Sequence, residues 1–166
     1  MMRLYTISDR YLSHLRQIDS KVPQAHGATY VVQKPYLGVV LTVDGHDFLA
    51  PLSSPKPWHD KIKSSELTIF KIHERTNENN KLGIIALKFM VPVLPTVIAE
   101  LDIAGQAPDY AHLLNMQYEY IKTKWGKIQS RADKLYDHVV TDPKPYLQGS
   151  TCDFANLINH TKSYIP

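Results

Sequence analysis

The hydrophobic and polar positions of the chain follow two different periods, which change near residue 108. Before that point, short runs of β-branched and aromatic residues alternate with polar ones, and this two-residue period predicts β-strands. After it, apolar residues recur every three or four positions, which predicts helices with one buried face. Strands gathered ahead of helices favour an α+β fold over alternating α/β units.

The first part of the chain predicts strands at residues 3–7, 36–43, 46–52, 68–73, 82–88 and 96–102. The strongest local signal is Asp44-Gly45 between two apolar runs, because a type I′ hairpin turn needs positive φ at both central residues. Residues 75–81 are polar and rich in asparagine, so they predict a turn. Residues 19–33 and 53–60 hold prolines and predict loops, and the second of these excludes a central strand or helix.

Three stretches predict helices. Ser8 can cap a first helix, whose apolar residues follow at helical spacing. A long apolar stripe after Pro108 predicts one helix, or two nearly collinear helices with a break at Gly126, because glycine costs about 1 kcal/mol there relative to alanine. After a loop at 142–150, Asp153 can cap a last helix through about residue 163. The stripe consists of Leu114, Tyr118, Ile121, Trp125, Ile128, Ala132, Leu135 and Val139.

Together these elements predict a single domain over residues 1–166, with a small twisted antiparallel sheet or open barrel flanked by helices. Cys152 is the sole cysteine, so the fold needs no internal disulfide and no oxidising compartment. No leader opens the chain, and no apolar run approaches the length of a membrane span, so we expect a cytoplasmic protein. The net charge of +3 and the pI of about 8.9 permit a polyanionic partner without demanding one.

Several kinds of chemistry lack their sequence signatures. The eight histidines do not pair with each other or with Cys, Asp or Glu at a recognised ligand spacing, so we expect no metal site. The glycines form no phosphate-binding loop, which argues against nucleoside triphosphate chemistry. Neither a G-x-S-x-G elbow nor a signature around Cys152 supports acyl transfer. We therefore expect no cofactor.

The segment that follows the predicted hairpin is unusual in its chemistry. Ser53, Ser54, Lys56, Trp58 and His59 lie within seven residues that also hold two prolines. One interpretation is a proline-rich turn whose serines cap a neighbouring backbone group. The other is a phosphodiester site, because hydroxyls donate to phosphate oxygens and lysine stabilises the charge that develops on them.

A second group lies upstream in residues 29–36, which include Tyr30 and Lys34. This stretch has the composition of an ordinary loop with a solvated lysine. In an RNA-binding protein, tyrosine could stack on a base and lysine could reach a phosphate. Local sequence alone leaves both interpretations open.

The chain resembles the ToxN/AbiQ-type toxins of type III toxin–antitoxin systems, and the similarity runs through nearly the whole chain in the same order. The segment at 49–56 is specific for its length, although Ser53 stands where the family pattern often has threonine. The stretches that match are 4–8 (LYTIS), 21–23 (KVP), 36–41 (YLGVVL), 49–56 (LAPLSSPK), 82–85 (LGII), 88–93 (KFMVPV) and 151–154 (TCDF).

The resemblance implies a sheet like that of the MazF/Kid class and an endoribonuclease that cuts cellular and phage RNA. It also implies an RNA antitoxin, cut from its own transcript into pseudoknot repeats that occlude the active site. Toxin and RNA would close into cyclic assemblies, and the role would be abortive infection against phage. Matched one by one to the family pattern, the active-site positions are Tyr30, Lys34, Ser53, Ser54 and Lys56.

RNA carries its own nucleophile, the 2′-hydroxyl, so a site that aligns it with the phosphate needs no metal and leaves 2′,3′-cyclic phosphate and 5′-hydroxyl ends. The general base is not identifiable from sequence: His59 could serve, or could be structural beside Trp58. Two alternatives stay open, a non-catalytic RNA-binding module and a structural protein that uses the long helical stripe as a partner surface. The residues expected to contact RNA are Lys34, Lys56, Trp58, His59, Lys61, Lys63, Lys122, Lys124, Lys127 and Lys144.

Overall fold

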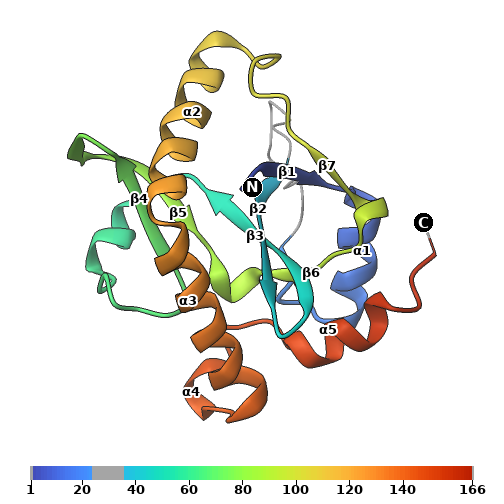
Figure 1. Cartoon of the computed structure of the whole chain (residues 1–166). Coiled ribbons are helices and arrows are strands. Elements are labelled where there is room, and N and C mark those ends of the chain that lie inside the picture. The colour runs from blue at the N-terminus through green and yellow to red at the C-terminus, as the bar shows by residue number, and fades with distance from the viewer. Residues whose placement is uncertain (1, 24–35, 166) are drawn as a thin grey trace.

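The computed structural model describes residues 2–23 and 36–165, in which an antiparallel sheet is combined with helices (Figure 1). The strands of the sheet run in the order β4-β5-β3-β2-β1-β7, and β6 pairs with β3 beside this path. All the pairings are antiparallel, as expected of an α+β fold. The strands are β1 (Leu4–Ile7), β2 (Leu37–Val43), β3 (His46–Ser53), β4 (Phe70–Glu74), β5 (Asn77–Ile85), β6 (Val91–Pro92) and β7 (Ile98–Glu100).

Helices cover the sheet and close its lower end in Figure 1. The α-helices are α1 (Asp9–Ile18), α2 (Pro108–Thr123), α3 (Trp125–Tyr136), α4 (Pro145–Gln148) and α5 (Phe154–Thr161). Three 3₁₀ turns lie at Pro57–Lys61, Leu87–Phe89 and Pro95–Val97, and a π turn at Asp137–Thr141 follows α3. The first of these turns, Pro57–Lys61, is called η1 below.

The local signals that rest on turn and capping chemistry are confirmed. Asp44 and Gly45 have φ values of 51° and 76°, as the type I′ turn between β2 and β3 requires. Ser8 caps α1 by accepting a hydrogen bond from the Tyr11 N–H, and Asp153 caps α5 in the same way from Asn156. Each cap fixes the residue at which its helix begins.

The long helical stripe is core, so its interpretation as a partner surface is wrong. Leu114, Ile121, Ile128 and Leu135 are fully buried in one cluster with the sheet. The break between α2 and α3 falls at Lys124 and not at Gly126. Lys124 has φ −106° and ψ 10°, and its N–H bonds to both Tyr120 and Ile121 carbonyls, so the chain departs from the helix for one residue and the stripe stays in phase.

Several predicted boundaries are wrong, because strand pairing and individual prolines fix where an element begins or ends, and composition averaged over a segment does not show this. Residues 75–81 are not a turn: β5 begins at Asn77, because Glu74 pairs with Asn77 across a two-residue connection. β5 ends at Ile85 where a 3₁₀ turn begins, and β7 is shorter than predicted because Pro95 opens a 3₁₀ turn. Pro57 and Pro145 likewise begin the short helices η1 and α4 inside predicted loops.

The strand β3 belongs to two parts of the sheet at once. Its residues pair with β2 over most of its length, and its last two residues, Leu52 and Ser53, pair with β5. Because side chains alternate across a sheet, the rows that these pairs form face opposite ways. Leu52, Ile85 and Phe70 make one row against the main core, and Ser53, Ile84 and Lys71 make the next row on the other face.

Gly83 allows this join to form. Its φ is +133°, and a Cβ built there would lie 2.2 Å from the backbone oxygen of Ser53. Only glycine fits both the backbone conformation and the close approach. β5 therefore contacts the end of β3 at the residue where the candidate site begins.

We predict that Gly83→Ala lowers the free energy of unfolding by roughly 1–3 kcal/mol through the strained φ alone, with a further loss from the clash with Ser53. Gly126→Ala is the matched control, since nothing lies within 4 Å of its added Cβ, and it should stabilise by up to about 1 kcal/mol. Urea unfolding of both variants measures the difference. Equal stability of Gly83→Ala and wild type would contradict the role given to this contact.

No helix among the described residues has the length and apolarity of a bilayer span. The likeness to the MazF/Kid class and the single domain over 1–166 stay predictions.

Candidate active site

Ser53 and Lys71 lie on the face of the sheet that is turned away from the main core. Ile84 lies between them in the same row and packs with Ile69 and Ala86 in a second, small hydrophobic cluster. Ile62 and Phe89 pack partly against this cluster from the segments that follow β3 and β5. The small cluster is thus an apolar floor with a hydroxyl at one side and an ammonium at the other.

The turn that follows β3 is closed by hydrogen bonds between Lys56 and His59. The Lys56 N–H donates to Nδ1 of His59 (3.1 Å), and the His59 N–H donates to the Lys56 carbonyl (3.0 Å). Pro57 occupies the first position of η1, where its fixed φ suits a helix start. The imidazole therefore holds the backbone of Lys56, and with it the start of the lysine side chain.

Side-chain exposure divides this segment into solvent-facing groups and one buried group. Ser54 and Lys56 are exposed, and Trp58 is 60% exposed although it is a large apolar residue. His59 is only 9% exposed and meets the Trp58 ring edge to face at 5.7 Å. An exposed indole beside exposed hydroxyl and ammonium groups is suited to stacking on a base.

The charges around His59 are mostly positive. Burial lowers the pKa of His59, and Lys56 and Lys71 lower it further; Asp60 opposes them, and Lys88 adds the smallest lowering effect. The carboxylate of Asp60 is itself held by a hydrogen bond from Lys81, which lowers its pKa. His59 is consequently neutral at pH 7, with three lysines near enough to lower its pKa.

The hydrogen bond to Lys56 also fixes which nitrogen of His59 carries the proton. A backbone N–H can only donate, so Nδ1 accepts and the proton of the neutral ring is on Nε2. A general base needs a free lone pair toward the substrate, and the one lone pair of this ring is already used. Of the two roles left open by the sequence, the geometry favours the structural one.

Tyr30 and Lys34 lie outside the described residues, but the residues on either side of that segment are described. Burial and the nearby Cys152 thiol raise the pKa of Tyr36. Before the segment that holds Tyr30 and Lys34, the Asp19 carboxylate accepts a hydrogen bond from the Asp153 N–H (2.7 Å). Cys152 in turn donates its N–H to the carbonyl of Lys88 (3.0 Å), one of the lysines around His59.

Cys152 itself is no candidate nucleophile. It is completely buried, and burial together with Asp19 raises the pKa of its thiol to about 12. The reactive form of cysteine is the thiolate, which is negligible at that pKa.

The predicted RNA-binding lysines fall into two groups, those that follow β3 and those of the C-terminal helices. Lys61 and Lys63 are exposed in and after η1. Lys122 is in α2, Lys127 is in α3, and Lys124 is the residue between them. On the main-core side, α2 packs on β4 and β5, and α3 packs on β2. Lys144 forms an ion pair with Asp142 (2.7 Å) before α4.

Two cations of this site were not found by sequence reasoning, Lys71 and Lys88. Alternation within residues 68–73 does place Lys71 opposite the buried Ile72 and Phe70. That signal shows only that Lys71 leaves the core, because its neighbour across the sheet depends on a register that the sequence does not state. Among the described residues, no three His, Cys, Asp or Glu side chains are grouped so that they could hold a metal ion.

Comparison with known proteins identifies the family. A family model described as "Toxin ToxN, type III toxin-antitoxin system" matches residues 3–162. The chain belongs to this ToxN family.

Two relatives of this chain have names that state an activity. It is 40% identical to "Endoribonuclease ToxN" of Pectobacterium atrosepticum over 158 residues, which covers 94% of this chain and 90% of the relative. It is 28% identical to "Endoribonuclease AbiQ" of Lactococcus lactis subsp. lactis over 160 residues, which covers 94% and 85%. The ToxN/AbiQ resemblance of the sequence is thereby confirmed.

Solved structures show the same fold. One, from work on a processed non-coding RNA that regulates a bacterial antiviral system, has a TM-score of 0.86 at 36% identity and 99% coverage of both chains. Another, from work on selective toxin inhibition by a non-coding RNA pseudoknot, has a TM-score of 0.82 at 28% identity, covering 98% and 97%. The sheet and helices of this chain are therefore those of its family.

We predict that His59→Ala slows RNA cleavage roughly fivefold, by loss of one hydrogen bond that holds Lys56, whereas His59→Asn retains most of the rate. The asparagine oxygen can accept from the Lys56 N–H as Nδ1 does, and it does not titrate. Initial rates on one RNA compare the two variants. A rate for His59→Asn as low as that of His59→Ala would contradict the positioning role.

The same hydrogen bond predicts a pH effect on stability. The unfolded chain protonates His59 near its ordinary pKa of 6.5, and the folded protein resists protonation, so the free energy of unfolding should fall as pH drops below about 6.5. The difference between wild type and His59→Asn isolates this effect from the other histidines. A difference that stays constant from pH 7.5 to roughly 5 would contradict it.

Proposed function

We propose that the chain is a metal-independent endoribonuclease toxin that cuts single-stranded RNA at the Ser53 face of the sheet. The observation that carries this proposal is the row formed by Ser53, Ile84 and Lys71, with the Lys56 turn beside it. That row sets hydroxyl and ammonium groups around one apolar floor. The relatives named endoribonucleases supply the reaction class.

In this mechanism the 2′-hydroxyl of the RNA attacks the adjacent phosphorus, and the 5′-oxygen of the next nucleotide leaves. Ser54 and Lys56 bind the nonbridging oxygens of the phosphate, with Ser53 in support. Lys71 and Lys88 add positive potential where negative charge develops. Alignment and charge stabilisation supply most of the rate, and the products are a 2′,3′-cyclic phosphate and a 5′-hydroxyl.

Lys34 and Tyr30 complete the proposed site. Lys34 would stabilise charge or protonate the leaving oxygen, and Tyr30 would position a base or the phosphate. Lys34 precedes Tyr36 by two residues, so the covalent chain keeps their Cα atoms within roughly 7 Å of each other. Tyr36 lies near Cys152, whose backbone bonds to Lys88, and this supports a place for Lys34 at the same site.

The proposed partner is an RNA antitoxin that folds as a pseudoknot and blocks the Ser53 face, as the work on one structural relative describes for selective toxin inhibition. The toxin would cut this RNA from its own transcript, close with it into a cyclic assembly in the cytoplasm, and act on cellular and phage RNA in abortive infection. Clustered phosphates need cations. Trp58 would contact RNA beside the cut, whereas the buried His59 would act through the turn of Lys56. The lysines proposed for the antitoxin are Lys61, Lys63, Lys122, Lys124, Lys127 and Lys144, of which Lys124 and Lys144 are only partly exposed.

We predict that Lys56→Ala reduces the cleavage rate roughly 10²-fold or more, because removal of one group that stabilises the developing oxyanion typically costs that much. Lys134→Ala is a control with the same change of charge at an exposed lysine that has no assigned RNA contact, and it should lose little. Initial rates with pure protein and labelled RNA measure both. Wild-type rates for Lys56→Ala would remove its assignment, and no cleavage by the wild type would leave a non-catalytic RNA-binding module.

We also predict that a 2′-deoxy substitution at the cut site abolishes the product, because it removes the nucleophile, and that cleavage persists in EDTA. Once the cut site is mapped, a gel of the substituted and unsubstituted RNA, each with and without EDTA, tests both points. Cleavage of the deoxy substrate would rule out attack by the 2′-oxygen. Loss of activity in EDTA that Mg²⁺ restores would rule out the metal-independent route.

A further inference from the structure

A pocket lies on the other side of the molecule from η1, between α1 and the residues that follow α5. Its volume is about 460 Å³, within the range typical of small-ligand sites, roughly 300–1,000 Å³. Arg10, Ser13, His14 and Gln17 line it from one face of α1, at the i, i+3, i+4 and i+7 positions of the helix. Ser163, Tyr164 and Ile165 form the opposite wall.

The walls of this pocket are held in place by buried contacts behind it. The Tyr11 hydroxyl donates to the Pro92 carbonyl and shares a hydrogen bond with Thr161 (2.9 Å), which joins α1 to β6 and α5. The Tyr164 ring meets the Tyr11 ring edge to face at 4.9 Å, and its N–H donates to the Thr161 carbonyl (3.2 Å). These contacts fix Tyr164 at the base of the pocket, whereas its rim, which includes Arg10, Gln17 and Ile165, is exposed to solvent.

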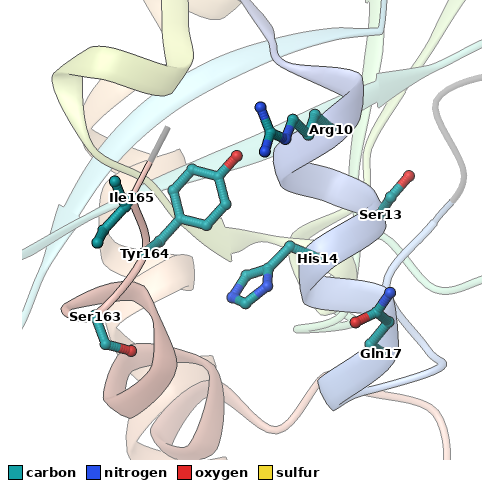
Figure 2. Close-up of a pocket in the computed structure, with 7 residues that line it drawn as sticks. All are labelled: Arg10, Ser13, His14, Gln17, Ser163, Tyr164 and Ile165. Atoms are coloured by element: carbon teal, nitrogen blue, oxygen red, sulfur yellow. The ribbon is translucent and has the colours of Figure 1, made fainter.

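Two groups that face the pocket are suited to a ligand, although the Ser163 hydroxyl already donates to the His160 carbonyl (3.1 Å). Nε2 of His14 is buried without a hydrogen-bond partner, which ordinarily costs about 1–3 kcal/mol. Arg10 forms no hydrogen bond or ion pair with another described residue, and none of the seven lining residues is acidic. Figure 2 shows Arg10, His14 and Tyr164 pointing toward one another across the pocket.

We propose that this pocket binds one nucleotide of an RNA strand, away from the cleavage site. A guanidinium fork matches a phosphate, the half-buried Tyr164 ring offers a surface for a base, and Gln17 and the serines can meet polar groups on its edge. The choice of RNA rests on the proposed function. An RNA strand and a free mononucleotide both present a nucleoside phosphate to the pocket, so the test must distinguish these two ligands.

The position of the pocket decides what it can do for the reaction. In Figure 1, α1 and α5 lie at the right of the molecule, whereas η1, which follows β3, lies at the left beside β4. An RNA strand held in both places passes around the protein. The pocket thus anchors RNA without touching the reacting phosphate, and its loss affects binding and KM more than kcat.

The test measures RNA binding by fluorescence anisotropy, with oligouridylate as the probe and Lys56→Ala as the background to prevent cleavage. Adding Arg10→Ala or Tyr164→Ala should weaken binding about tenfold, and Tyr164→Phe should bind nearly as well as the background because it keeps the ring. Lys162→Ala is the matched control, an exposed cation beside the pocket that does not line it, and its effect should stay below about twofold.

Cleavage assays with Lys56 intact provide the second readout. Arg10→Ala should raise KM with little change in kcat, and uridine monophosphate alone should bind more weakly to Arg10→Ala than to wild type. Unchanged RNA binding and KM in both Arg10→Ala and Tyr164→Ala would overturn the proposal, and so would a loss that Lys162→Ala matches. Uridine monophosphate binding that depends on Arg10 while RNA binding does not would overturn RNA as the occupant. Failure of the wild type to cut RNA would refute the proposed function instead.

Discussion

The candidate active site depends on one contact between backbones, the approach of Gly83 in β5 to the carbonyl of Ser53 at the end of β3. β3 already pairs with β2 and β6 through its earlier residues. Without a glycine at 83, β5 could not come close enough to add its pairs with Leu52 and Ser53. The join gives the last residue of β3 a fixed register against β4 and β5, and so a fixed set of neighbours.

Because side chains alternate along β3, two neighbouring residues have different roles, one in the core and one in the candidate site. Leu52 is in the row that joins the main core, and Ser53 is in the row that faces the small cluster around Ile84. A shift of register by one residue would bury the hydroxyl and expose the leucine. The main core therefore holds Ser53 in its outward position through Leu52, without contacting it.

The sequence predicts the parts of the fold and of the site that depend on local chemistry. It does not predict the parts that depend on which strands pair and in which register. Asp44-Gly45, Ser8 and Asp153 mark a turn and two caps correctly, since each acts on its immediate neighbours. Serine, lysine and histidine side chains within residues 53–59 were identified by composition and by resemblance. Lys71 was missed because it joins Ser53 only through Ile84, across two strand pairings whose register depends on Gly83.

His59 stays neutral near three lysines, and its neutral ring accepts the hydrogen bond that holds the Lys56 turn. Lysines held near one another repel, and a protonated imidazole near them would add a further positive charge that Asp60 offsets only in part. Burial and these same lysines keep the ring neutral, so that Nδ1 stays free to accept the Lys56 N–H. A phosphate bound in this place would lower the repulsion that the free protein tolerates. The positive potential of the site therefore depends on the strand pairing that fixes Lys71 and on the uncharged ring that fixes the turn of Lys56. A polyanion such as RNA would reduce the repulsion between these lysines.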